Sequence, residues 1–284
     1  MNIRQVRKKI KTIGNVKKIT KAMELVSAVK MRKAQQEEVE GRPYRDTLDS
    51  VITKISKLID SKFSALLKNN KSNRELVILI SSNKGLCGSF NFNLFRYSVK
   101  NIDFSKSDFI ILGKKAGSLV GKMGGKIIAD FSTNKPLNSV SAIFNLCLKK
   151  FLDSEYESVY LVYNRFISAL RYEPVKEKLL PVKFEARPKK GEEKKVEEEY
   201  LIEPAPEKII DSLLRDFVEE KIRGAVISNE AGEHSARMIS MKNATENAGD
   251  LIYDMTLLRN KLRQQKITYE LLDMITAKES VESV

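Results

Sequence analysis

The stretch SSNKGLCGSFN, residues 81–91, has the composition of a loop that could bind phosphate. It follows a short apolar run and precedes a helical pattern, which is where proteins of alternating strands and helices hold phosphate groups. The spacing of Gly85 and Gly88 matches neither G-x-x-x-x-G-K-[ST] nor G-x-G-x-x-G. We therefore interpret the stretch as a tight strand-to-helix turn that needs both glycines, with nucleotide binding as the less favoured alternative.

Thiol and imidazole groups are scarce in this sequence. Cys87 could be a reactive thiol at a helix N-terminus, but no paired Cys, His or Asp is near it, so we expect a small buried residue. Cys87 and Cys147 have neither the number nor the spacing of a disulfide framework or zinc site, which favours a reducing compartment. A single histidine, His234, argues against a histidine metal cage. Without a Ser/His/Asp set or a clustered carboxylate pair, the sequence predicts no intrinsic catalysis, no cofactor and no metal.

The positive charge of the 284-residue chain, +14 in total, is concentrated at its start. Residues 1–33 carry eleven Lys or Arg against one acid, Glu24. This asymmetry indicates an acidic or phosphate-bearing partner, or a charged helix in a polar cavity. A merely solvated helix face is the plainest alternative.

A nucleic-acid arm, a membrane-surface helix and a transit peptide fit the basic start of the chain less well. A nucleic-acid binder would use these lysines on phosphates, but residues 1–43 hold no aromatic side chain to stack on bases. A membrane-surface helix would need Trp, Phe or a broad Leu face opposite the lysines. A transit peptide would show a break at its cleavage site, and here the pattern continues, so we expect mature structure. No window approaches the length of an apolar membrane span, so we expect no membrane insertion.

Apolar residues recur in steps of three and four from the first residues onward, which predicts a long helix. The spacing is close to a coiled-coil seam, with an extra three-residue step that breaks strict heptads. Gly41 and Pro43 would normally end or kink a helix. The pattern resumes after them, so we expect about sixty helical residues, roughly 90 Å in length. We expect this stripe to face a partner helix; its members are Ile3, Val6, Ile10, Ile13, Val16, Ile19, Met23, Val26 and Val29.

Between residues 76 and 184, short apolar runs alternate with helix-like stretches. The runs are LVILIS, FIILG, KIIAD and VYLVY, and the helix-like stretches are 91–100, 114–123 and 138–152. Strands alternating with helices imply right-handed crossovers and a mostly parallel sheet covered by helices. We therefore expect a compact α/β domain over residues 74–186.

The remainder of the chain is predicted to be a solvated, charged linker loop at 187–204 and a second long helix at 205–284. Near its end, residues seven apart form a weak seam of methionine and small side chains. They are Met238, Thr245, Ile252 and Arg259, and Met241, Ala248, Met255 and Leu262. One compact domain cannot bury two long stripes, so we expect residues 1–60 and 205–284 to pair as a long antiparallel two-helix coiled coil. The expected fold class is α/β, with this rod projecting from the α/β domain.

Four segments, in order along the chain, resemble the gamma subunit of F-type ATP synthases. They are KKITKAMELVSAVKMRKAQ, SSNKGLCGSFNFNL, YLIEPAPEKIIDSLL and EHSARMISMKNATENAGDLIYDMTLLRNKLRQQKITYEL. The resemblance implies a non-catalytic central rotor shaft that couples proton-driven rotation of the c-ring to ATP synthesis or hydrolysis at the beta subunits. It implies four partners, namely the alpha and beta subunits of a hexameric ring, the epsilon subunit and the c-ring. It also implies a peripheral location at the cytoplasmic face of the bacterial plasma membrane.

The resemblance implies individual contact residues as well. The positions that match contacts to the beta-subunit loops are Met23, Arg237, Arg263, Gln264, Thr268 and Glu270, and the foot region that faces epsilon and the c-ring includes Tyr200 and Glu203. Arginine suits such contacts because its planar fork can exchange bidentate carboxylate partners as a shaft turns. The sequence departs from the family at Lys266, where relatives tend to have a small residue. The regulatory cysteine pair of chloroplast members has no counterpart, so we expect no redox switching.

Two alternatives of other classes stay open on sequence grounds. One is a basic coiled-coil protein that binds nucleic acid, although such a protein has no need of a methionine-rich seam. The other is a nucleotide-binding α/β protein that uses the turn at Gly85, although such a protein should show a complete phosphate motif.

Overall fold

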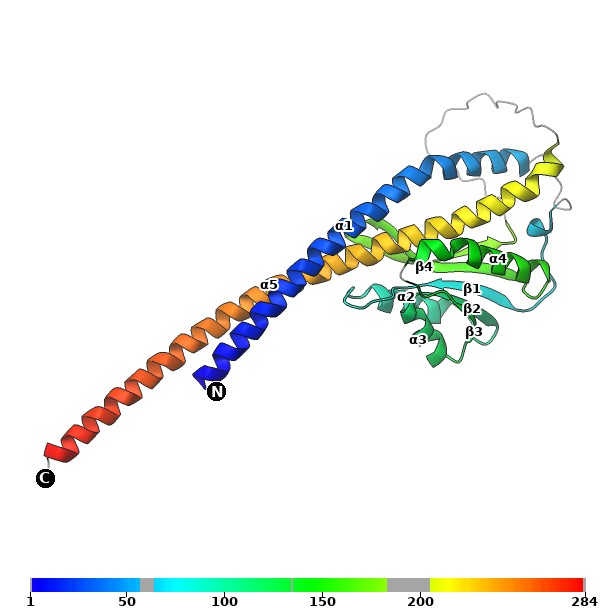
Figure 1. Ribbon diagram of the computed structural model, residues 1–284. Coiled ribbons are helices and arrows are strands. Elements are labelled where there is room, and N and C mark those ends of the chain that lie inside the picture. Colours follow the sequence, from blue (N-terminus) through cyan, green and yellow to red (C-terminus); the bar gives the residue numbers. More distant parts are fainter. Residues whose placement is uncertain (1, 57–63, 134, 183–204, 283–284) are drawn as a thin grey trace. The chain divides into compact units, whose positions relative to one another are not determined.

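A computed structural model describes residues 2–56, 64–133, 135–182 and 205–282 (Figure 1). The predicted linker 187–204 lies outside these ranges. The chain divides into two compact units: Met1–Ala28 with Arg237–Val284, and Val29–Ala236. The long helices α1 (Ile3–Ser56) and α5 (Pro206–Glu282) each contribute to both units.

Helix α1 continues without interruption through Gly41 and Pro43. The predicted continuity of this helix is therefore confirmed up to Ser56, and the predicted end near residue 60 falls outside the described residues. Within the described ranges, neither long helix holds an apolar stretch that could cross a lipid bilayer.

The second unit is built on a five-stranded sheet with the order β3-β2-β1-β4-β5. The strands are β1 (Glu75–Ile80), β2 (Ser107–Leu112), β3 (Lys126–Asp130), β4 (Ser158–Ser168) and β5 (Arg171–Leu180). The pairs among the first four strands are parallel, and β5 is antiparallel to β4. The four predicted strands and the mostly parallel sheet are confirmed, whereas the edge strand β5 was not predicted.

Helices cover both faces of the sheet, which explains why the strands read as continuous apolar runs. On one face Leu76, Ile78 and Ile80 share a core cluster with α4 (Val140–Leu152) and with parts of α1 and α5. On the other face Val77 and Leu79 pack with α2 (Phe90–Asn101) and α3 (Lys114–Lys122). Figure 1 shows α4 and the pair α2 and α3 on opposite faces of the sheet. The 3-10 helices η2 (Ala65–Leu67) and η3 (Pro136–Ser139) connect these elements.

The turn between β1 and α2 differs in detail from the prediction. Gly88 has a positive φ of 56°, which glycine adopts without strain, in agreement with the predicted need for a glycine there. Gly85 has open space around its Cα and no positive φ, so the prediction that the turn needs a glycine there was wrong. The left-handed position is instead taken by Leu86, with φ 62°.

Candidate partner interface

The first unit contains an antiparallel pair of helical segments. Thr20 of α1 and Thr245 of α5 are joined by a 2.7 Å hydrogen bond between their hydroxyl groups. Nearer the chain start on α1, Lys17 Nζ would lie 3.0 Å from a Cβ placed on Gly249 of α5. Since the contacts move in opposite directions along the two helices, the predicted antiparallel pairing is confirmed within this unit.

The face of α1 that is buried in this pair coincides only in part with the apolar stripe. One buried or half-buried row has a spacing of seven and consists of Val6, Ile13, Thr20 and Ser27, and the stripe members Ile3, Ile10 and Met23 are half-buried as well. Of the predicted stripe, Val16 is 46% exposed, Ile19 59% and Val26 56%. Two consecutive steps of three after Ile13 turn the stripe back around the helix by about 60° each. The prediction that the whole stripe faces the partner helix was therefore wrong for Val16, Ile19 and Val26, whose side chains form an exposed apolar face.

The seam predicted on α5 is confirmed. All eight of its members, from Met238 to Leu262, are buried or half-buried. The strict seven-residue spacing keeps these side chains on one face, which α1 covers over part of its length. Around the seam, large apolar side chains remain exposed, and they include Leu251, Tyr253, Leu257, Ile267, Tyr269, Leu271, Leu272, Met274 and Ile275.

Exposed apolar side chains in this number are typical of a surface that another protein covers. Sequence reasoning missed them because they lie outside the heptad seam. The usable signal was Tyr253 and Tyr269, since aromatic residues are enriched in the cores of protein interfaces.

The contact residues implied by the family resemblance fall into two groups. Met23 is half-buried on α1, and its carbonyl oxygen accepts a 2.7 Å hydrogen bond from Ser27 Oγ. Arg237, at 7% exposure, is buried. The two residues therefore present much less surface to a partner than the C-terminal group does.

The C-terminal group is fully open to solvent. Arg263, Gln264, Thr268 and Glu270 are all exposed on α5. Thr268 Oγ1 donates to the Gln264 carbonyl oxygen at 3.0 Å, and Glu270 pairs with Lys266 at 3.3 Å. Lys266, the departure from the family pattern, thus partly neutralises a predicted contact residue. Tyr200 and Glu203 lie outside the described residues.

Cations make up the second chemical feature of this surface. The eight basic residues of the first six turns of α1 are all exposed; they are Arg4, Arg7, Lys8, Lys9, Lys11, Lys17, Lys18 and Lys21. Lys21 pairs with Glu24 at 2.9 Å. An apolar and cationic surface of this kind fits a partner that presents apolar side chains and carboxylates.

The turn predicted as a possible phosphate loop is closed by its own hydrogen bonds. Ser82 Oγ donates to the Lys84 carbonyl oxygen at 2.8 Å, and Asn91 Nδ2 donates to Ser82 Oγ at 2.7 Å and to Cys87 Sγ at 3.2 Å. In the neighbouring strand β4, two residues beyond its last pair with β1, the buried Asn164 donates from Nδ2 to the Phe90 carbonyl oxygen at 3.1 Å. Several polar groups of this turn are therefore used in bonds within the protein, which disfavours the nucleotide-binding alternative.

The two thiols are buried, as expected for Cys87. Burial raises the pKa of the Cys147 thiol well above its usual range, which disfavours the reactive thiolate. The described residues bring together no group of three or more His, Cys, Asp or Glu side chains that could hold a metal ion.

A carboxyl group with a raised pKa lies between α1 and α5 in the second unit. Burial, together with the neighbouring carboxylates of Glu233 and Glu37, raises the pKa of Glu230 to about 7, and Lys30 and Lys33 oppose the shift. Because the folded chain favours the protonated carboxyl, the stability that this group contributes is fully present below its unfolded pKa near 4.5. That contribution is lost as the pH rises through about 7.

Glu230→Gln should therefore raise stability in a pH-dependent manner. We expect the variant to gain about 1–3 kcal/mol in the free energy of unfolding at pH 8 and little at pH 5. Denaturant unfolding of both chains at the two pH values measures this difference. Glu246→Gln, at an exposed position of the same helix, is the matched control. An equal gain at both pH values would contradict the prediction.

Comparison with known proteins gives a consistent result. A family model described as ATP synthase matches residues 2–281. The ATP synthase gamma chain of Akkermansia muciniphila is 34% identical over 290 residues, which cover 99% of this chain and 99% of the relative.

Solved structures resemble the chain over most of its length. A chain of the rotor of Euglena gracilis mitochondrial ATP synthase has a TM-score of 0.66 and 23% identity, covering 93% of this chain and 98% of its own. A chain of the OSCP/F1/c-ring structure of the same enzyme has a TM-score of 0.69 and 21% identity. The match covers 99% of this chain and 95% of that chain. A chain of the central stalk and c-ring structure of Tetrahymena thermophila mitochondrial ATP synthase has a TM-score of 0.58 and 24% identity. The match covers 80% of this chain and 99% of that chain. At these identities the likeness establishes the fold.

Proposed function

Because this chain belongs to the ATP synthase gamma chain family, we propose that it is the central rotor shaft of an F-type ATP synthase. In this role it couples proton-driven rotation of a c-ring to ATP synthesis or hydrolysis at the beta subunits. The observation that carries the proposal is the helix pair of the first unit, whose apolar and cationic side chains are exposed on both helices. The structural relatives, which are chains of a rotor, a central stalk and a c-ring assembly, agree with it.

The exposed faces of α1 and α5 supply the contacts that a rotor shaft needs. Apolar side chains such as Val16, Ile19 and Leu257 lie against subunit surfaces without fixing one partner, so contacts can exchange as the shaft turns. The lysines and arginines of α1 attract carboxylate-bearing loops over a longer range. Arg263 and Glu270 can form charge-assisted hydrogen bonds with successive beta subunits.

Rotation and catalysis are then coupled by differential affinity. A shaft orientation that favours one conformation of a nucleotide site is itself favoured when nucleotide stabilises that conformation. The chain performs no bond-making step in this scheme and holds no nucleotide. Its partners are the alpha and beta subunits of the hexameric ring, the epsilon subunit and the c-ring. Its proposed location is peripheral, at the cytoplasmic face of a bacterial plasma membrane, as suggested by the bacterial relative.

Co-purification with alpha and beta subunits tests this function. We expect the full chain to form a complex with them that couples ATP hydrolysis to proton pumping. Removal of residues 237–284, the α5 part of the first unit, should abolish that coupling. Stable binding of the chain to RNA without association with alpha and beta subunits would favour the nucleic-acid alternative instead.

Met23→Lys is predicted to weaken coupling more than folding. The new cation lies among the residues proposed to meet the beta-subunit loops, where a charge-assisted pair with a carboxylate would be worth about 1.5–3 kcal/mol. A bond of that strength holds the shaft at one angle, so fewer protons are pumped for each ATP hydrolysed. Proton pumping and ATP hydrolysis, measured together in membrane vesicles, report the ratio.

The matched control for this substitution is Val16→Lys, which adds the same charge at an exposed apolar position of the same helix. We expect a smaller loss of coupling in this control, and unfolding temperatures close to the parent for both variants. Tight coupling in Met23→Lys would refute the prediction.

A further inference from the structure

Helix α1 has a weak point inside the second unit. Pro43 lies in its interior, where proline lacks the N–H that would bond four residues back and its ring crowds that carbonyl group. Gly41, two residues earlier, costs a helix interior about 1 kcal/mol relative to alanine. Both residue types favour a kink, and the helix nonetheless continues to Ser56, as the apolar spacing on either side predicts.

The side chain of Arg45 bridges this weak point. Its Nη2 atom donates to the main-chain carbonyl oxygen of Glu38 at 3.1 Å and lies 2.8 Å from the Glu38 carboxylate oxygen Oε1. The two residues are seven apart, about two helical turns, so the guanidinium group spans the turn that contains Pro43. The carbonyl oxygen that Pro43 leaves without its i+4 N–H donor is that of Val39, and Arg45 bonds one residue earlier, at Glu38. A bond from a charged donor is about twice as strong as a neutral one, so it helps to hold the turn that precedes the proline.

Both glycines beside Arg45 fit this arrangement. A Cβ on Gly41 would lie 2.8 Å from Arg45 Nη1, so the side chain passes where any other residue would project. On the facing helix α5, a Cβ on Gly224 would lie 3.7 Å from Arg45 Cδ and Nε. Arg45 thus lies against the bare backbone of α5, and its side chain is only 17% exposed.

The surroundings of Arg45 are open rather than close-packed. A cleft of about 500 Å³ lies between α1, α5 and the strands β4 and β5, and Arg45, Glu38 and Gly224 form part of its wall. Arg45 Nη1 and Glu38 Oε2 are buried and have no hydrogen-bond partner. Leaving such atoms unsatisfied costs free energy, so the pair is poorly explained as a device for stability alone.

We propose that Arg45 is a positioning residue. Its bonds to Glu38 act as a splint, which keeps α1 straight across Pro43, and its packing at Gly224 holds α1 against α5. Without the splint, α1 would flex into the adjacent cleft. With it, the two helices of the second unit turn together under load. This last step rests on the proposed rotor function, whereas the splint itself does not.

Hydrogen exchange of the full chain tests the splint directly. In Arg45→Ala the backbone amides of residues 40–48 should exchange about 5- to 30-fold faster, the factor expected for the loss of one or two kcal/mol. Arg45→Lys should restore little of the protection, because an ammonium group lacks the planar fork that reaches both acceptors. Arg42→Ala, which removes an exposed arginine from the same segment, should leave exchange unchanged.

A second substitution tests the packing of Arg45 against Gly224 of α5. Gly224→Leu leaves Arg45 in place but occupies the space its side chain uses, so it should speed exchange at residues 40–48 as Arg45→Ala does. Folding of each variant is checked by circular dichroism, and Gly224→Leu provides the measurement if Arg45→Ala fails to fold. Parent-like exchange in a folded Arg45→Ala or Gly224→Leu chain would overturn the proposal.

The mechanical consequence is measured in the assembled complex. Single-molecule recording of a stalled rotor should show larger angular fluctuations for Arg45→Ala than for Arg42→Ala. Equal fluctuations alongside faster exchange would confine Arg45 to a local splint and overturn its role under load. Failure of the parent chain to assemble with alpha and beta subunits would instead count against the proposed function. The hydrogen-exchange result would still decide whether Arg45 stabilises α1 near Pro43.

Discussion

Gly113→Ala is expected to prevent the second unit from folding. Gly113 follows β2 and precedes α3, with a φ of 110° that side chains rarely permit. A Cβ at this position would lie 2.2 Å from the carbonyl oxygen of Ser81 and 2.7 Å from its carbonyl carbon. These are backbone atoms, so the contact cannot be relieved by a rotamer change.

The surroundings of Gly113 are fixed by hydrogen bonds on both sides. The Ser81 backbone N–H donates to the Leu112 carbonyl oxygen at 2.8 Å, and Ser81 Oγ donates to the Gly113 carbonyl oxygen at 3.0 Å. Ser81 Oγ also accepts a 2.8 Å bond from the Ala116 N–H. Relief of the clash would separate the ends of β1 and β2, so we expect a loss above about 4 kcal/mol in the free energy of unfolding.

Thermal unfolding and the yield of soluble chain measure this effect. The matched control is Gly121→Ala in α3, where a Cβ would meet no atom within 4 Å. Removing a glycine from a helix should stabilise that variant by up to about 1 kcal/mol. If both alanine variants unfolded at the parent temperature, the close contact at Ser81 would not exist in solution.

The two long helices show what apolar spacing can and cannot predict. On α5 the seven-residue spacing of Met241 and Ala248 identifies the buried face, because such a spacing keeps side chains on one side of a helix. On α1 the apolar stripe coincides with the buried face only in part, since Thr20 and Ser27 are buried while Ile19 is exposed. A single sequence does not separate an apolar face that meets its own chain from one that meets another protein.

The strand β5 was missed for a related reason. Its residues include Pro174 and several charges, which are usual on an edge strand but depress any strand prediction. The turn that precedes it, Ala169 and Leu170, holds none of the Gly, Asn or Asp that marks a two-residue hairpin, so it gave no signal either. The continuity of α1 through Pro43 was predicted from the apolar spacing on either side, whereas the bond from Arg45 to the Glu38 carbonyl oxygen, seven residues away, was not.

The candidate interface is predictable only in part from one chain. The cationic start of α1 follows from composition, but the partners of Arg263 and Glu270 belong to other subunits. The resemblance to a family supplied these positions, and their exposure on α5 is compatible with it. Spacing and charge alone would have left nucleic acid as a competing partner.

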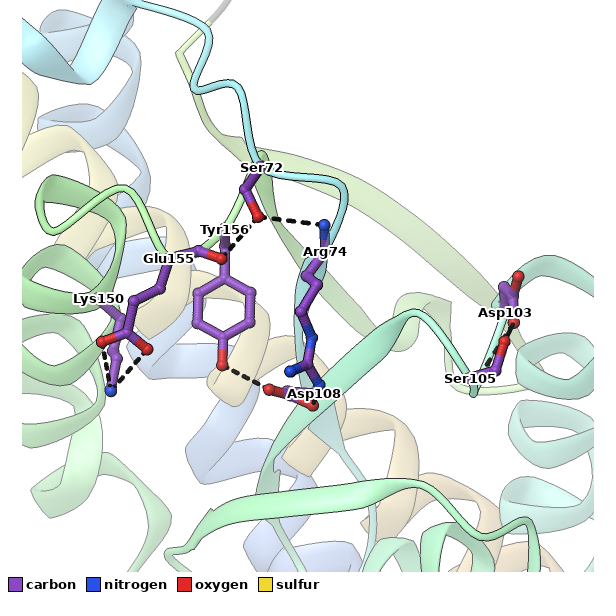
Figure 2. Close-up of polar contacts among 8 residues, drawn as sticks. All are labelled: Ser72, Arg74, Asp103, Ser105, Asp108, Lys150, Glu155 and Tyr156. Atoms are coloured by element: carbon purple, nitrogen blue, oxygen red, sulfur yellow. Dashed lines mark hydrogen bonds and ion pairs between the residues drawn. The ribbon is translucent and has the colours of Figure 1, made fainter.

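Asp108→Ala is expected to destabilise the second unit by about 1.5–3 kcal/mol, the range for the loss of hydrogen bonds to a buried charged group. Asp108 is 1% exposed near the start of β2. Figure 2 shows its carboxylate between the Arg74 guanidinium group, with which it forms an ion pair, and the Tyr156 hydroxyl group. The hydroxyl donates to Asp108 Oδ2 at 2.6 Å.

These contacts tie three parts of the unit together at the amino ends of the parallel strands. Arg74 directly precedes β1, and its backbone N–H donates to Ser72 Oγ at 3.3 Å. Ser72 Oγ donates in turn to the Glu155 carbonyl oxygen at 2.7 Å, in the segment that joins α4 to β4 (Figure 2). Loss of the Asp108 carboxylate therefore leaves a cation and a buried hydroxyl without their shared partner.

Asp103→Ala separates this effect from the loss of any carboxylate. Asp103 accepts bonds from the Ser105 N–H at 3.0 Å and from Ser105 Oγ at 2.6 Å, and these bonds lower the pKa of Asp103, but its side chain lies in a solvent-exposed loop. We expect Asp103→Ala to unfold at a denaturant concentration close to that of the parent. Asp108→Asn keeps the shape and one acceptor oxygen, so it should fall between the two alanine variants in denaturant unfolding. If Asp108→Ala were no less stable than Asp103→Ala, the ends of the strands would be held by the apolar core alone, and the polar cluster would have no part in the stability of this unit.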